Sequence, residues 1–149
     1  MKGIEIINRK ASFSYHFLQS FEAGILLSGS EVKSIKAGNA NMSDAYCIIE
    51  RGEVWIKNFH ITEYKQSMEK EYNPKRDRKL LLNKSEIRKI ERKIAEKGLT
   101  LIPYKMYLSE RGLLKLEIIV ASGKKSYDKR ESIKEKDEKR NLERDFKLR

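Results

Sequence analysis

This chain has very few of the residues that build disulfides, metal sites and histidine-based catalytic sites. It contains one cysteine, Cys47, and two histidines, His16 and His60. A single cysteine cannot form an internal disulfide, and so few Cys and His residues do not make a usual zinc site. Cys47 lies inside an apolar strand pattern, which predicts a buried small hydrophobic residue rather than a nucleophile. We therefore expect no bound metal ion.

Long apolar runs are missing as well. No apolar stretch approaches the roughly eighteen residues of a membrane-spanning helix, so no membrane partner is expected. Charged residues follow Met1 almost at once, and no signal peptide is visible. These features predict a cytoplasmic protein.

The motifs of catalysis and cofactor binding are also lacking. Neither histidine has a catalytic motif around it, and the carboxylates are interleaved with lysines, as on a solvated face. The chain has no P-loop and no dinucleotide fingerprint. We therefore expect a protein that is not an enzyme and has no cofactor. A small RNA-processing enzyme is the alternative, but no candidate set of catalytic residues is visible for it.

Positive charge is what the chain has in excess. Its 149 residues include 33 Lys or Arg against 22 Asp or Glu, which gives a net charge of +11 and a pI of about 9.7. A balance of this kind favours a polyanionic partner. Hydrophobic residues make up 39% of the chain, enough for the core of one domain.

The composition changes after Ala121. Residues 123–149 contain eleven Lys or Arg and seven Asp or Glu, and their few apolar residues offer too little area to offset the entropy of ordering. We predict a body over residues 1–122 and a basic tail over residues 123–149 that is disordered alone. Because the tail has no Pro and is rich in helix formers, it should fold as a helix on a partner.

Three helices are expected in the body. Phe13, Phe17, Leu18 and Phe21 recur at helical spacing, which predicts an amphipathic helix over residues 12–21. A short helix should follow over residues 31–36. A third should begin near Asn83, bury Ile87, Ile90 and Ile94, and end at Gly98.

The remaining body favours antiparallel strands. Residues 45–50 and 53–58 flank Arg51-Gly52 and predict a hairpin. Residues 99–108 and 113–121 read as two more strands, and Pro103 indicates a bulge or a strand edge. Residues 64–78 are polar and predict an exposed loop. We expect a mainly β fold with about three peripheral helices, an antiparallel β-barrel like the OB fold.

Several basic and polar side chains lie at turns and strand ends, which favours RNA binding. Lysines neutralise phosphates, and Asn and Tyr side chains contact unpaired bases and 2′-hydroxyls. Two of the candidate residues have structural interpretations as well. Glu31 would compensate the dipole of the helix that it begins, and His60 would be a hydrogen-bonded histidine at the end of a strand. The candidates are Lys33, Lys36, Asn39 and Asn41 in one short segment, with Arg78, Lys79, Lys124 and Lys125 beside strands.

One segment carries a resemblance to a known family. Residues 29–38, GSEVKSIKAG, are similar to the GTEVKSLRAG segment of small protein B, the tmRNA-binding family of bacterial trans-translation. Further segments resemble motifs of that family, in the same order along nearly the whole chain: NRKA at 8–11 followed by Tyr15, EAGI at 22–25, NFHI at 58–61 followed by Tyr64, RKLLL at 78–82, KGLTLIP at 97–103 and GKKSYDKR at 123–130.

The resemblance implies a non-enzymatic RNA chaperone and adaptor. Its OB-like barrel would hold the tRNA-like domain of tmRNA, and the complex would enter a stalled ribosome for trans-translation, that is, ribosome rescue and degradation tagging. We expect a monomer, with one or more copies per tmRNA. The resemblance places Glu31, Lys33, Lys36, Asn39, Asn41, His60, Lys124 and Lys125 on the tmRNA face.

The resemblance also gives the tail a role. The tail would become helical in the empty decoding centre and mRNA path, where it would meet ribosomal RNA through Lys129, Arg130, Lys134, Lys136, Lys139 and Arg140. The family carries an apolar pair before a lysine near the C-terminus, and here only Phe146 of that pair is kept. A generic OB-type ribosomal RNA-binding or ribosome-assembly protein is the second interpretation of the chain.

Overall fold

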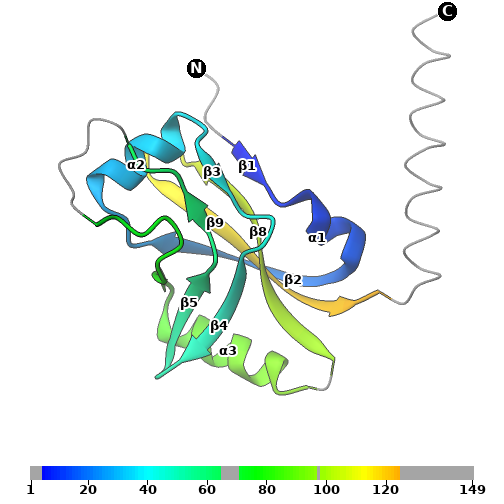
Figure 1. The fold of residues 1–149 in the computed structure, drawn as a ribbon. Helices are drawn as coiled ribbons and strands as arrows, with labels where there is room; N and C mark the ends of the chain where they lie inside the picture. Colours follow the sequence, from blue (N-terminus) through cyan, green and yellow to red (C-terminus); the bar gives the residue numbers. More distant parts are fainter. Residues whose placement is uncertain (1–4, 65–70, 97, 125–149) are drawn as a thin grey trace, which may run out of the picture.

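The chain is mainly β in the computed structural model, which describes residues 5–64, 71–96 and 98–124. Seven of its strands form one antiparallel sheet in the order β1-β8-β9-β2-β7-β5-β4, and β3 pairs with β6 in a small second sheet (Figure 1). The sheet curls until β4 contacts β8, which gives the OB-like barrel expected from the sequence. The strands are β1 (Glu5–Ile7), β2 (Tyr15–Ile25), β3 (Ala40–Asn41), β4 (Tyr46–Glu50), β5 (Glu53–Lys57), β6 (His60–Ile61), β7 (Arg78–Leu81), β8 (Leu99–Leu108) and β9 (Leu114–Gly123).

In the described part of the chain, three helices lie at the periphery of the sheet, in line with the expected number (Figure 1). They are α1 (Arg9–Ser14), α2 (Gly29–Lys36) and α3 (Lys84–Ile94). The prediction of a helix near Asn83 is confirmed, because α3 starts after an Asn83 capping box and buries Ile87 and Ile90. Gly98 follows with a φ of 85°, a conformation that suits glycine. Among the described residues, no helix is long and apolar enough to cross a membrane.

The long strand β9 is paired along its length with β2 on one side and β8 on the other. Its side chains alternate between two apolar clusters, because successive strand residues point to opposite faces. Leu116, Ile118 and Val120 lie in the main core. Ile119 and Ala121 lie in a smaller cluster, together with Ala11 of α1. β9 is therefore covered on both faces near its end.

The prediction of a helix over residues 12–21 is wrong. α1 ends at Ser14, and the chain continues as β2, which pairs with β9 from Tyr15 to Gly24. Phe17 and Leu18 completed the apparent helical stripe, but their side chains remain partly exposed, at 38% and 57%. The ladder to β9 shifts register between Phe17 and Gln19, which marks a β-bulge, so the apparent helical stripe lies on a bulged strand.

The predicted hairpin is confirmed as β4 and β5. Arg51 and Gly52 have φ values of 54° and 74°, the left-handed pair that a tight two-residue turn requires. Cys47 of β4 is buried, as expected. Burial raises the pKa of its thiol. The register of β8 against β9 shifts at Pro103, which confirms the predicted bulge.

The structure describes only part of the predicted loop over residues 64–78 and of the predicted tail over residues 123–149. Residues 65–70 of the predicted loop lie outside the described residues, but residues 71–78 are held by side-chain contacts that are described below. β9 includes Gly123, and the amide of Lys124 still donates to the Ser14 carbonyl at 2.9 Å. β9 therefore includes the first residue of the predicted tail. Residues 125–149 of the predicted tail lie outside the described residues.

Candidate nucleic-acid interface

The short helix α2 begins with two reciprocal hydrogen bonds. The Glu31 amide donates to Ser28 Oγ at 3.3 Å, and the Ser28 amide donates to Glu31 Oε1 at 2.9 Å. This capping box satisfies two backbone donors that a helix start leaves free. The stretch from Ser28 therefore specifies where α2 starts, and it turns the Glu31 carboxylate back toward the barrel.

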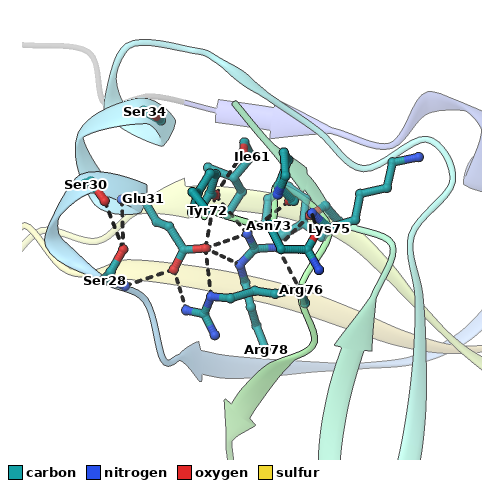
Figure 2. Close-up of polar contacts among 12 residues, drawn as sticks. Ser28, Ser30, Glu31, Ser34, Ile61, Tyr72, Asn73, Lys75, Arg76 and Arg78 are labelled. Carbon is teal, nitrogen blue, oxygen red and sulfur yellow. Dashed lines mark hydrogen bonds and ion pairs between the residues drawn. The ribbon is translucent and has the colours of Figure 1, made fainter. Parts of the chain in front are cut away.

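The Glu31 carboxylate is buried between two arginines (Figure 2). Arg78 Nε donates to Oε2 at 2.7 Å, and Arg76 Nε donates to the same oxygen at 3.1 Å. Arg76 Nη2 also contacts Oε1. The side chains of Glu31 and Arg78 have no exposed surface. The prediction that Glu31 and Arg78 contact RNA is therefore corrected: both side chains lie inside the protein and hold the segments together.

Arg78 fixes the segment that precedes β7. Its Nη1 donates to the Phe59 carbonyl at 2.6 Å, and its Nη2 donates to the Pro74 carbonyl and the Tyr72 hydroxyl at 3.1 Å each. The five donors of a guanidinium suit such a role, because they point in fixed directions. A single buried arginine thus joins β7 to the chain before β6 and to residues 72–74.

Tyr72 extends this network to β6. Its hydroxyl lies 2.9 Å from the Ile61 carbonyl and 3.2 Å from Glu31 Oε2. Burial and the neighbouring Glu31 charge raise the pKa of Tyr72, so it stays a neutral donor. We call Glu31, Tyr72, Arg76 and Arg78 the carboxylate clamp. The clamp connects α2, β6 and β7.

The charge of Glu31 is stabilised within the clamp. Burial alone would raise its pKa, but the hydrogen bonds from Arg76, the Ser28 amide and Arg78 outweigh that effect and lower it from 4.5 to about 2. Glu31 is therefore ionised at any physiological pH. The dipole interpretation of Glu31 was incomplete, since two arginines more than forty residues away dominate its surroundings.

The other side of α2 presents two exposed lysines. Lys33 and Lys36 are exposed, whereas Ile35 is fully buried beneath them. Lys33 Nζ lies 5.5 Å from the centroid of the Tyr64 ring, within the range of a cation–π contact. Ser34 Oγ donates to the Thr62 carbonyl at 2.6 Å, which binds α2 to the chain after β6. α2 therefore holds both ammonium groups at the surface on a fixed support.

The small sheet of β3 and β6 brings Asn41 and His60 together. The two residues face each other in the register of the sheet, and both line a polar pocket of about 310 Å³. Asn41 Oδ1 accepts a hydrogen bond from the Ser43 amide at 2.8 Å. Asn39 is exposed just after α2, and its carbonyl accepts from the Thr62 amide at 3.0 Å. The structure thus joins Asn39, Asn41 and His60 to the exposed side of α2.

Three residues of this region were missed by sequence reasoning. Tyr72 and Arg76 belong to the clamp, and Lys75 lines the pocket of Asn41 and His60. All three lie in the segment that was expected to be an exposed loop. The spacing of Arg76 and Arg78 was the available signal, because residues two apart in an extended chain point to the same side.

The other predicted contacts lie elsewhere or beyond the described residues. Lys79 pairs with Glu53 at 3.6 Å and lines a separate pocket against α3. Lys124 lies at the end of β9, where its ammonium group donates to the Ser12 carbonyl at 3.1 Å. The residues outside the described part of the chain are Lys125, Lys129, Arg130, Lys134, Lys136, Lys139, Arg140 and Phe146.

Comparisons with known proteins agree with one another. The model of the SmpB protein family matches residues 5–148. The SsrA-binding protein of Parabacteroides distasonis is 47% identical over 145 residues, which cover 97% of this chain and 95% of that protein. The SsrA-binding protein of Chlorobaculum tepidum is 53% identical over 138 residues, which cover 93% and 88%.

A solved structure shares the fold. It is described as "tmRNA-SmpB: a journey to the center of the bacterial ribosome", and one of its chains superposes with a TM-score of 0.70 at 39% identity, covering 87% of this chain and 94% of that one. The family match spans nearly all 149 residues. With the antiparallel barrel and the three helices of its described residues, the chain belongs to the SmpB protein family.

Proposed function

We propose that this chain binds the tRNA-like domain of tmRNA and delivers it to stalled ribosomes for trans-translation. Its relatives are named SsrA-binding proteins, and its structural neighbour is described as tmRNA-SmpB in the bacterial ribosome. The observation that carries the proposal is the surface of α2, where exposed Lys33 and Lys36 lie on a helix that the carboxylate clamp fixes to the barrel. The role is binding, with no chemical step.

The surface around α2 matches folded RNA in its chemistry. Lys33 and Lys36 neutralise phosphates, which makes the affinity depend on salt. Asn39, Asn41 and His60 supply hydrogen-bond donors and acceptors next to them, suited to riboses and unpaired bases. The buried Glu31 and Arg78 side chains of the clamp support this surface from inside the protein. Because the clamp already holds α2 in place, less conformational entropy is lost when this surface binds RNA.

A charge-removal experiment tests the α2 surface. The variant Lys33→Ala/Lys36→Ala should bind the tRNA-like domain about tenfold or more weakly, and each lost phosphate contact should reduce the slope of log K against log [salt] by about 0.7–0.9. The matched control is Lys89→Ala/Arg92→Ala, which removes the same charge from exposed positions of α3. Equal losses in the two variants would show that only net charge matters and would contradict the proposed surface.

The tail is proposed to act in the ribosome rather than in tmRNA binding. We assign the part of the predicted tail that follows Lys124, residues 125–149, to the empty decoding centre and mRNA path, where Lys129, Arg130 and the basic residues that follow would meet ribosomal RNA. The chain should be ended after Lys124, because β9 runs to Gly123 and the Lys124 amide bonds to Ser14. That version should keep its affinity for tmRNA and lose tagging on stalled ribosomes.

A single substitution makes the same test within the full chain. Phe146→Ala should spare tmRNA binding and impair tagging, and normal tagging would remove Phe146 from the proposal. If the full-length protein does not prefer tmRNA to an unrelated structured RNA, the tmRNA proposal is wrong. A general ribosomal RNA-binding role would then replace it.

A further inference from the structure

A second hollow lies between α1, the turn before β4 and the end of β9. Its volume is about 440 Å³, within the range of roughly 300–1,000 Å³ that is common for sites that hold small molecules. The side chains that matter here are two tyrosines, two lysines, one carboxylate and one amide: Tyr15, Tyr46, Lys10, Lys124, Asp44 and Asn8.

The end of β9 and the end of α1 build one wall of this pocket. Tyr15 lies opposite Gly123 in the β2–β9 ladder, and Figure 1 shows the end of β9 passing beside α1. The Lys124 amide donates to the Ser14 carbonyl at 2.9 Å, and its ammonium group donates to the Ser12 carbonyl at 3.1 Å. This wall therefore carries the ring of Tyr15 and the ammonium group of Lys124, which the hydrogen bonds to Ser12 and Ser14 hold in place.

Asn8 contributes an acceptor that the protein does not use. Its Nδ2 donates to the Pro103 carbonyl at 3.1 Å, and its Oδ1 accepts no hydrogen bond from the described residues although the side chain is 93% buried, at 7% exposure. An Asn that precedes a helix ordinarily accepts a hydrogen bond from the first turn, and Asn8 makes no such bond. A buried acceptor without a donor is unfavourable, but Oδ1 has almost no accessible surface, so Asn8 shapes the wall of the hollow and does not contact a ligand directly.

The turn before β4 adds an exposed aromatic ring and a carboxylate to the lining. Tyr46, the first residue of β4, is 45% exposed, and Asp44 precedes it by two positions. A half-exposed tyrosine next to a polar turn contributes little to the core, but it offers a flat surface on which a base can stack. Asp44 accepts hydrogen bonds and repels phosphate. It therefore favours the base edge of a nucleotide over its phosphate.

This pocket continues into the pocket of Asn41 and His60. Ser43 and Asp44 line both hollows, so the two share one rim. A single strand of RNA that leaves the α2 surface would therefore reach Tyr46 without crossing the barrel. Neither hollow is lined by a long apolar stripe of the kind that receives a protein helix.

We propose that this pocket holds one unpaired nucleotide whose base carries an exocyclic amino group. The base stacks against Tyr46 and Tyr15, and its phosphate lies toward Lys10 and Lys124. Its amino group donates to the exposed carboxylate of Asp44. Uracil is disfavoured, because it presents a carbonyl where cytosine presents an amino group. The inference rests on the proposed RNA-binding function and adds a site and a base preference to it.

The test compares two single-stranded RNA hexamers, oligocytidine and oligouridine, with the full-length protein. The two differ chiefly in the amino and carbonyl groups, so a preference reports on the acceptors of the pocket. We expect oligocytidine to bind about threefold or more tightly, the usual scale of one added hydrogen bond. Ultraviolet crosslinking followed by mass spectrometry should place the RNA on Tyr46 or Tyr15.

Variants of Tyr46 separate stacking from folding. Tyr46→Leu should weaken oligocytidine binding about fivefold or more, because stacking on an aromatic ring is lost, whereas Tyr46→Phe should keep it. Phe17→Leu is the matched control, since Phe17 is also a partly exposed aromatic residue of the sheet but does not line the pocket. Equal affinity for both hexamers, or the same loss in Tyr46→Leu and Phe17→Leu, would overturn the proposal.

The outcomes distinguish this inference from the proposed function. If tmRNA binds through Lys33 and Lys36 but the hexamers show no preference, the pocket is wrong and the proposed function stands. If neither tmRNA nor the hexamers bind, both are wrong. An acidic peptide can be compared with unlabelled oligocytidine as a competitor for the pocket. If the peptide displaces bound oligocytidine at the lower concentration, the pocket belongs to a protein partner and the nucleotide assignment is overturned.

Discussion

Replacing Glu31 with glutamine would leave the buried Arg78 guanidinium without its counter-charge. Arg78 has no exposed side-chain surface, and the variant would offer it one carbonyl oxygen in place of a carboxylate. The new amide group would also point a donor at a site that is already rich in donors. Arg76 would lose the same partner, but its side chain is 39% exposed and can turn to water.

The burial of the ion pair and the lowered pKa of Glu31 both indicate the size of the effect. Breaking a buried ion pair by removing one partner costs about 3–5 kcal/mol. The lowering of the Glu31 pKa from 4.5 to about 2 corresponds to about 3 kcal/mol of folding free energy at neutral pH. A domain of this size is stable by roughly 5–15 kcal/mol. We therefore expect Glu31→Gln to fold, with a melting temperature lower by about 10 °C.

Urea unfolding at several pH values is the assay. The folded-state pKa of Glu31 is depressed, so its stabilisation is complete above pH 4.5 and is lost as the pH falls toward about 2. The difference in free energy of unfolding between the wild type and Glu31→Gln should therefore be largest at pH 7. It should shrink as the pH falls from 4.5 toward about 2. Glu50→Gln is the control, because Glu50 is 54% exposed in its ion pair with Lys57 and should change stability by less than about 1 kcal/mol. A gap below about 1 kcal/mol at pH 7, or one that does not change with pH, would refute the clamp as a source of stability.

Three further predictions concern other parts of the barrel. Ser28→Ala removes the acceptor at the start of α2 and should cost about 1 kcal/mol in urea unfolding; an unchanged midpoint would mean that the clamp alone positions the helix. Ile90→Ala should cost about 2–5 kcal/mol in the same assay, because the side chain of Ile90 on the inner side of α3 is fully buried, whereas exposed Lys89→Ala should stay within about 0.5 kcal/mol. The Cys47 thiol is buried and its pKa is raised, so a thiol reagent at pH 8 should label it only after denaturant is added. Rapid labelling of the native protein would show that β4 opens readily.

Local patterns predicted the elements whose determinants lie close together in the chain. The β4–β5 hairpin follows from Arg51-Gly52 between two β-rich segments, and α3 from its own cap and apolar stripe. The failed helix over residues 12–21 shows the limit of such patterns. Tyr15 to Gly24 are held by a ladder to β9, about a hundred residues away, and that pairing overrides a local helical spacing.

The candidate site divides in the same way. The exposure of Lys33 and Lys36 follows from the periodicity of one short segment, and the structure agrees. The burial of Glu31 and Arg78 does not follow from any local pattern, because these two residues pair with each other across 47 positions of the chain. A charged residue looks solvent-exposed in a sequence until its counter-ion is known. The pocket of Tyr46 and Lys124 is likewise assembled from distant segments that only the folded barrel brings together.

The position of β9 has a mechanical consequence. β9 is the last described strand, and it is hydrogen-bonded to β2 and β8 along most of its length. Its ladder bonds run across the strand direction, so a pull along the strand from Lys124 loads both ladders in shear. All bonds then resist together, rather than one after another as when an edge strand is peeled away. A force applied to the barrel at Lys124 along β9 therefore acts on two ladders at once.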